Sequence, residues 1–211
     1  MERLLQEISP LYLALPDGPE LEVRPLEKRD QERVQKAYSM LSRESRMNRF
    51  WQKPVELSQA RASSLTDSAN GKHIAWAAFS PDNDALPGYA GASFWRDEKE
   101  SSRAELTFTV ADAWHRSGFA TMLFSILYHE GWWMGVRQFH GVARLANTAM
   151  VSWWESMGGT VKETSRQYEM VLDLESPSQF IEKVGFEMPP STRRVETAEW
   201  LMEWAGRLEV G

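Results

Sequence analysis

The sequence contains no cysteine among its 211 residues. This absence excludes disulfide bonds, thiolate metal ligands and cysteine nucleophiles within the chain. The sequence also lacks a stretch of about 18 apolar residues, and its first residues, MERLLQEISP, lack the apolar core of a signal peptide. We therefore expect a cytoplasmic protein without a membrane-spanning helix.

Positive charge is not in excess. The chain has 24 Lys and Arg residues against 30 Asp and Glu residues, which gives a formal net charge of −6. Nucleic-acid binding needs clustered basic residues, so we expect no nucleic-acid partner. An acidic protein attracts cationic substrates better than anionic ones, and the net charge therefore favours a cationic substrate.

Several catalytic motifs are also missing. The sequence has no Gly-x-Ser-x-Gly elbow and no Gly-x-x-x-x-Gly-Lys-Ser/Thr loop, which disfavours a hydrolase or a nucleoside triphosphatase. The histidines are scattered, without the His-x-x-x-His spacing of a helical zinc site. They are His73, His115, His129 and His140. We expect no metal site.

The composition is that of a globular domain, because 42% of the residues are hydrophobic and 26% are charged. The length fits one domain, which we place at residues 1–175, with a hairpin at its N-terminal end. Residues 176–211 form a separate tail, because Pro177, Pro189 and Pro190 interrupt it before a short amphipathic helix at about 195–208. We expect this helical tail to pack on the domain or at a homodimer interface.

Short strands and helices alternate along the domain. Asp30 and Ser58 are candidate N-caps of two helices, and turn residues at 16–19 separate the first two strands. The expected strands are residues 11–15, 21–24, 73–79, 89–95, 104–110, 136–144, 160–163 and 166–172, and the expected helices are 30–41, 57–65, 118–134 and 146–157. This order predicts an α/β (α+β) fold with helices flanking a mixed, mostly antiparallel sheet.

The clearest strand, residues 104–110, leads into a turn suited to phosphate binding. The next helix begins near Gly118, and the unbonded amides and positive dipole end of a helix N-terminus bind phosphate groups. Gly118 permits close approach of the backbone, Ala120 keeps the following turn small, and Arg116 adds a cation. The sequence therefore predicts a pyrophosphate site at residues 115–121.

Several motifs, in this order, resemble the GCN5-related N-acetyltransferase (GNAT) superfamily. The family signature Gln/Arg-x-x-Gly-x-Gly/Ala matches residues 115–120, His-Arg-Ser-Gly-Phe-Ala, with His in the first place. Trp114, the Val-Ala-Asp at 110–112 and the pattern Asn147-x-x-Met-Val-x-x-x-Glu-x-x-Gly are also similar. Residues 23–30 and 41–50 look like the N-terminal part of bacterial protein-lysine acetyltransferases, and the likeness covers roughly residues 11–174.

The resemblance implies a V-splayed sheet with acetyl-CoA between the strands at 104–110 and 136–144. The pantetheine arm would pair with the backbone of Phe108, Thr109 and Val110, and Asn147 would contact or position this arm. The residues implied around the pyrophosphate are His115, Arg116, Ser117, Gly118, Phe119, Ala120 and Thr121.

The implied reaction transfers an acetyl group to a primary amine. An alkylamine is protonated at neutral pH, so a base must remove a proton, and Glu105 corresponds to the base of the similar lysine acetyltransferases. The Tyr that serves many members as general acid corresponds to Trp154, which cannot give a proton to a thiolate. The role is therefore vacant, filled by water, or taken by another residue, for which Tyr128 and Tyr168 are the candidates.

The acceptor is a small-molecule amine or a protein lysine, and residues 42–70 and 80–88 are expected to form its site together with the tail. The arginines at 43–49 grip an acidic substrate group or a CoA phosphate, or form a solvated helix end. Two alternatives stay open. One is a non-catalytic acetyl-CoA-binding sensor or regulatory module, which Trp154 favours, and the other is an acyl donor other than acetyl-CoA.

Overall fold

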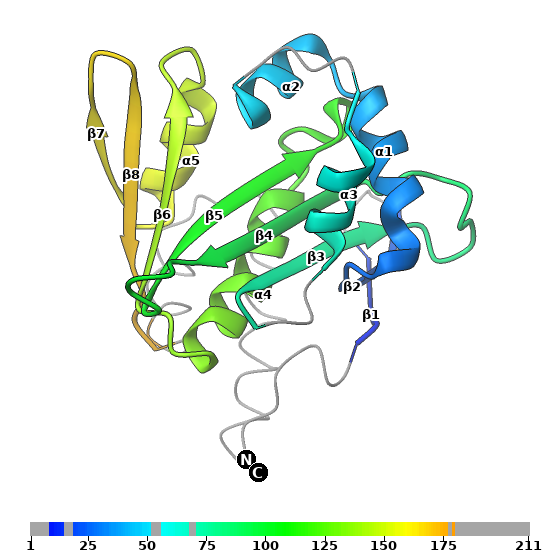
Figure 1. The fold of residues 1–211 in the computed structure, drawn as a ribbon, viewed down its shortest axis with the longest axis horizontal. Helices are drawn as coiled ribbons and strands as arrows, with labels where there is room; N and C mark the ends of the chain where they lie inside the picture. The colour runs from blue at the N-terminus through cyan, green and yellow to red at the C-terminus, as the bar shows by residue number, and fades with distance from the viewer. Residues whose placement is uncertain (1–8, 15–18, 52–55, 68–70, 177–178, 180–211) are drawn as a thin grey trace. The chain divides into compact units, whose positions relative to one another are not determined.

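The computed structural model describes residues 9–14, 19–51, 56–67, 71–176 and 179. In this part of the chain, eight strands form a mixed sheet in the order β1-β2-β3-β4-β5-β6-β8-β7 (Figure 1). The strands are β1 (Leu11–Ala14), β2 (Glu20–Pro25), β3 (His73–Phe79), β4 (Ala90–Arg96), β5 (Arg103–Val110), β6 (Gln138–Arg144), β7 (Thr160–Glu163) and β8 (Gln167–Asp173). The α-helices are α1 (Gln31–Met40), α2 (Arg43–Phe50), α3 (Gln59–Thr66), α4 (Phe119–Trp133) and α5 (Thr148–Ser156).

The predicted fold class is confirmed. β5 and β6 are parallel, whereas β1–β2, β2–β3, β3–β4, β6–β8 and β7–β8 are antiparallel. The described residues divide into two compact units. The N-terminal unit contains the described residues up to Trp95 and Thr107–Leu127, and the C-terminal unit contains Arg96–Leu106 and the described residues from Tyr128 onward. The three boundaries among the described residues all fall inside an element, so each unit includes part of β4, part of β5 and part of α4.

In the N-terminal unit, helices cover both faces of the antiparallel strands. α1 and α3 lie on one face of β3 and β4, and α4 lies on the other (Figure 1). All seven residues of β3 are buried, which suits the almost entirely apolar sequence HIAWAAF. The register places Ala77 opposite Gly91 and Ala75 opposite Ser93, so small side chains gather on the face below α1.

A buried ion pair fixes the start of α1. The Arg24 guanidinium donates to both carboxylate oxygens of Asp30, at 2.7 and 2.9 Å, and the amide of Glu27 donates to the same carboxylate. Burial works to raise the pKa of Asp30, but these hydrogen bonds outweigh it, and the pKa lies below its ordinary value. Asp30 does occupy the N-cap position of α1, as predicted, but its side chain bonds Arg24 and Glu27 instead of an α1 amide.

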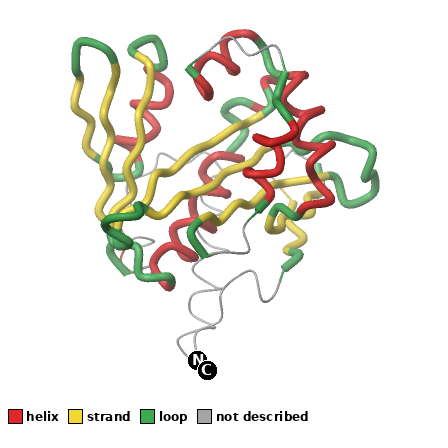
Figure 2. The backbone as a smooth tube through the Cα atoms, in the orientation of Figure 1, coloured by secondary structure: helices red, strands yellow, loops and turns green. Residues whose placement is uncertain are grey.

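In the C-terminal unit, β6, β8 and β7 are adjacent strands with α5 packed against them (Figure 2). Trp154 of α5 is buried, and its indole N–H donates to the carbonyl of Val171 in β8 at 3.2 Å. A Cβ atom on Gly159 would overlap the Trp154 ring, so glycine is required there. The ladder between β5 and β6 runs from Arg103–Gln138 to Glu105–His140, although both strands continue further.

The predicted strands and helices begin and end within two residues of the observed ones. The exception is α2, for which no separate helix was predicted. Its arginines were expected either to bind an anionic group or to lie at a solvated helix end. Within the described residues, no helix is long and apolar enough to cross a membrane. The helix expected at about 195–208 lies outside the described residues.

Candidate functional site

The turn between β5 and α4 has an unusual backbone. Residues Asp112–Trp114 form one 3₁₀ turn, Arg116 has a left-handed backbone with φ +61°, and Gly118 has φ +90°. A non-glycine residue in this conformation costs about 1 kcal/mol or more, and such strain gathers at binding sites. The amide of Met122 donates to the Gly118 carbonyl, so Gly118 begins the helix. Among the described residues, the amides of Gly118, Phe119 and Ala120 have no hydrogen-bond acceptor.

Three aromatic rings hold this turn in place. Tyr89, just before β4, has its ring centroid 5.5 Å from Trp114 and 5.9 Å from Phe119, and the last two are 5.8 Å apart. Aromatic pairs at these separations are favourable, with edge-to-face contacts among them. The amide of Ala111 also donates to the Tyr89 carbonyl at 2.9 Å. The turn is therefore anchored to β4 before any ligand binds.

Asp112 joins the turn to α2. Its carboxylate accepts hydrogen bonds from the amide and hydroxyl of Ser42 and from the hydroxyl of Ser45, each at 2.7 Å. Burial raises the pKa of Asp112, but the hydrogen bonds from Ser45 and Ser42 lower it by more. The pKa of Asp112 therefore lies below its ordinary value. The Ser42 hydroxyl also accepts from the Ser45 amide as the N-cap of α2. Asp112 belongs to the Val-Ala-Asp motif at 110–112, but this motif does not predict the contact with α2.

The side chains of the predicted phosphate turn are mostly solvent-facing. His115 and Arg116 are exposed, while Ser117, Gly118 and Ala120 are half-buried. The His115 ring Nε2–H donates to the carbonyl of Val110 at 3.1 Å, so this side chain closes the end of β5. Phe119 is 1% exposed, and it contributes its ring to the anchor of the turn.

β5 carries the other predicted residues on two faces. The Phe108 ring lies 6.4 Å from Phe124 of α4, and Thr107 faces the opposite way, where its hydroxyl accepts from Arg49 and bonds Ser93. Because side chains alternate along a strand, Glu105 and Thr109 share the face of Thr107. The Glu105 side chain is exposed.

Asn147 and the candidate acids belong to the C-terminal unit. The Asn147 carboxamide oxygen accepts from the Met150 amide at 3.3 Å, which makes Asn147 the N-cap of α5. The indole N–H of Trp154 is occupied by Val171, so this residue is structural. The Tyr128 hydroxyl bonds the backbone of Glu175 in both directions, and burial raises its pKa above the ordinary value. Tyr128 is therefore a poor acid, and Tyr168 is half-buried on β8.

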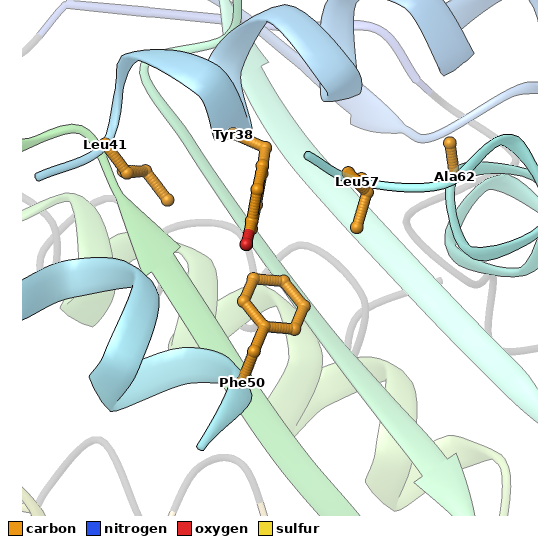
Figure 3. Close-up of a cluster of buried hydrophobic side chains, with 5 residues drawn as sticks. All are labelled: Tyr38, Leu41, Phe50, Leu57 and Ala62. Atoms are coloured by element: carbon orange, nitrogen blue, oxygen red, sulfur yellow. The ribbon is translucent and has the colours of Figure 1, made fainter. Parts of the chain in front are cut away.

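A cavity of about 100 Å³ lies within the N-terminal unit, between α1, α2 and α3 and the strands β3, β4 and β5. Its floor consists of small side chains, among them Ala75, Ala77, Ser93 and Thr107. The helices contribute an apolar wall, in which the Tyr38 and Phe50 rings meet edge to face at 5.0 Å beside Leu41 and Leu57 (Figure 3). This wall lies partly in residues 42–70, where the acceptor site was expected.

Two arginines are the charged residues of the cavity lining, and within the described residues no Asp or Glu lines it. Arg33 stacks on the Phe79 ring at 4.0 Å and donates to the Leu86 carbonyl and to Asp84. Arg49 reaches from the end of α2 to the Thr107 hydroxyl at 3.1 Å. Arg49 thus lies half-buried at the cavity rather than at a fully solvated helix end.

Comparison with known proteins supports the fold. No family profile matches the chain. The GNAT domain of S. lividans PAT is similar with a TM-score of 0.70 and 24% identity, over 78% of this chain and 96% of that one. A putative acetyltransferase from Salmonella typhimurium, solved with its cofactor acetyl-CoA, has a TM-score of 0.59 and 17% identity, over 74% of this chain and 95% of that one.

A third structure is longer than this chain. The cAMP-binding acyltransferase from Mycobacterium smegmatis has a TM-score of 0.58 and 18% identity over 92% of this chain, which spans 55% of that protein. The chain therefore has the fold of GNAT domains, as the sequence motifs predicted.

Proposed function

We propose that the protein is an N-acetyltransferase that moves an acetyl group from acetyl-CoA to a primary amine. The observation that carries this proposal is the turn at residues 115–121. It combines the family signature with two left-handed residues, three amides that have no acceptor among the described residues, and an anchor of three aromatic rings.

The turn fits the pyrophosphate of a CoA thioester. Its unbonded amides lie at the start of the 15-residue helix α4, where the helix dipole favours an anion. No atom of the described residues lies within 4 Å of the position a Cβ atom would take on Gly118, so this part of the chain leaves the backbone open to a ligand. The bound thioester supplies an activated acetyl group, and the chain's own residues must position it and handle the proton.

Glu105 is the proposed base. Its exposed carboxylate is available to accept the proton of an alkylammonium acceptor, either directly or through water. The neutral nitrogen then forms a bond to the acetyl carbon while the bond from that carbon to sulfur breaks. CoA leaves as a thiolate, and the second proton of the acylated nitrogen passes to this thiolate or to water, which gives the neutral amide. The thiolate needs little help to leave, because thiol pKa values lie at about 8.5. The buried, bonded Trp154 and Tyr128 are therefore dispensable as acids.

Thiol release from acetyl-CoA in the presence of a panel of primary amines tests the proposal. We expect Glu105→Gln to lower kcat/KM roughly 100- to 10,000-fold, as removal of a general base does, while the affinity for CoA stays unchanged. Glu169→Gln changes an exposed glutamate on β8 and serves as the matched control. Binding of acetyl-CoA without thiol release on any amine would instead identify a non-catalytic sensor.

A further inference from the structure

The proposed base has a histidine as its neighbour on the next strand. Glu105 of β5 is paired with His140 of β6 in the parallel ladder, and both residues belong to the C-terminal unit. We infer that His140, oriented by Asp97, is the final acceptor of the proton that Glu105 removes from the amine. The inference rests on the proposed acetyl transfer and adds a proton relay to it.

Glu105 and His140 point to the same face of the sheet. Residues opposite each other in a ladder point the same way, and neighbouring strands lie about 4.8 Å apart. Two residues earlier on this face, Arg103 donates to the Gln138 side chain at 2.8 Å, so side chains of these strands meet across the ladder. Glu105 is exposed, and His140 is half-buried. Among the described residues they do not hydrogen bond each other, so the proton passes through one water or after rotation of the Glu105 side chain.

Asp97 fixes the orientation of the His140 ring. The ring Nε2 lies 3.0 Å from Asp97 Oδ1, and the two side chains are only 26% and 31% exposed. An ionised carboxylate can only accept, so Nε2 carries the hydrogen and Nδ1 of the neutral ring keeps a lone pair. Asp97 is itself held, because its amide donates to the Arg103 carbonyl at 2.9 Å. Within the described residues, Nδ1 has no hydrogen-bond partner, which leaves it available to a proton.

The other strand beside β6 brings no titratable group opposite His140, because the partner there is Val171 of β8. The remaining charged side chains that the registers assign to this face of the described strands are Arg103, Arg144, Lys162, Glu169 and Asp173. Asp97, in contact with the ring, and Glu105, opposite it, are therefore the carboxylates best placed to stabilise an imidazolium.

The relay compensates for the weakness of a carboxylate as a base. In model peptides the pKa is about 4.3 for a glutamate, 6.5 for a histidine and 10.4 for an alkylammonium. The alkylammonium gives a proton to Glu105, and the resulting carboxylic acid gives it to Nδ1 of His140. Compared with transfer to the carboxylate alone, this second step makes the neutral amine about 100-fold more abundant in the site. The imidazolium releases the proton to solvent after the acetyl transfer.

A double-variant cycle tests whether the two residues act in series. We expect His140→Ala to lower kcat/KM for thiol release roughly 10- to 100-fold, while the affinity for CoA stays unchanged. Because the relay runs through Glu105, the double variant Glu105→Gln/His140→Ala should lose no more than Glu105→Gln alone. Losses that multiply in the double variant would overturn the inference. If His140→Ala does not fold, His140→Gln takes its place, since it keeps a side-chain donor for Asp97.

Rescue by a free base separates a proton relay from a purely structural contact. Added imidazole should raise kcat/KM of His140→Ala roughly 10-fold, whereas pyrazole, a ring of the same size but a much weaker base, should not. Rescue by both rings, or by neither, would overturn the inference. Asp97→Asn should lower kcat/KM by a smaller factor. Asp173→Asn removes a carboxylate of the same face, bonded to Gln138 at 2.7 Å, and should leave kcat/KM unchanged.

The same assay separates this inference from the proposed function. Thiol release by the wild type that is equally fast in His140→Ala would refute the relay and leave the acetyl transfer standing. Absence of thiol release by the wild type with every amine tested would refute the proposed function, and the relay with it.

Discussion

Replacement of Gly118 by aspartate, compared with asparagine, isolates the electrostatics of the phosphate turn. Gly118 has φ +90°, and none of the described residues has an atom within 4 Å of the position of an added Cβ atom. Both replacements therefore carry similar backbone strain, about 1 kcal/mol or more, and neither meets a steric obstacle. The two variants differ in one negative charge. Their difference in CoA affinity reports the repulsion between that charge and a bound pyrophosphate.

The expected size follows from Coulomb's law. Two unit charges about 5 Å apart repel by about 1 kcal/mol in bulk water and about 3 kcal/mol at a protein surface. We therefore expect Gly118→Asp to bind CoA roughly 5- to 100-fold more weakly than Gly118→Asn in a calorimetric titration. The difference should shrink in 1 M salt, where the screening length falls to about 3 Å.

Gly135 provides the matched control, because it has φ +84° and lies beyond the other end of α4. In the described part of the chain, no atom lies within 4 Å of its added Cβ position either. Gly135→Asp and Gly135→Asn should bind CoA alike. Equal CoA affinity of Gly118→Asp and Gly118→Asn would refute the placement of the pyrophosphate at this turn.

Two further predictions concern stability. His73 is fully buried against the Trp95 ring, and burial lowers its pKa from 6.5 to about 4, so the unfolded chain binds more protons than the folded one between these values. His73 therefore contributes up to about 3 kcal/mol of folding stability above pH 6.5, and this contribution is lost as the pH falls towards 4. His73→Phe should make the free energy of unfolding depend less on pH between 4 and 6.5. An unchanged pH dependence in this variant would contradict the prediction. Trp154→Phe removes the indole donor to Val171 and should cost about 1–3 kcal/mol in urea unfolding while kcat is retained. A large loss of kcat in a folded Trp154→Phe variant would show instead that Trp154 takes part in catalysis.

The strands and long helices were predictable because their patterns are local. The sequence HIAWAAF is apolar on both faces, and β3 is buried along its length. Ser58 was predicted as an N-cap, and its hydroxyl accepts from the Arg61 amide. Such patterns lie within a few residues of the chain, so they predict these elements without knowledge of the tertiary contacts.

Features that depend on distant residues were missed. α2, with the sequence RESRMNRF, has a single buried side chain, Phe50, and no apolar stripe to reveal it. Its N-terminus is bonded by Asp112, which is 70 residues from Ser42. Asp30 was predicted as a cap, but its carboxylate lies with Arg24, because a buried guanidinium is a stronger partner than an amide.

The candidate site also has features with a local sequence pattern and features that depend on distant residues. The glycine and the small residues of the turn at 115–121 predicted a phosphate site. Arg116 and Gly118 have a left-handed backbone there, and phosphate binding at this turn stays a prediction. Tyr89, which anchors the turn through Trp114 and Phe119, carried no local signal. The prediction that Glu105 acts as base remains a prediction, because it concerns a reaction.

The most direct test of the acetyl transfer follows the acetyl carbon itself. Acetyl-CoA labelled in the acetyl group is incubated with the protein and a panel of primary amines that includes a lysine peptide, and the products are analysed by NMR. We expect the label to appear in an amide bond to the acceptor nitrogen, in the same amount as the released CoA thiol, and we expect Glu105→Gln to lower both strongly. Label that remains in acetyl-CoA, or appears only as free acetate, would contradict it.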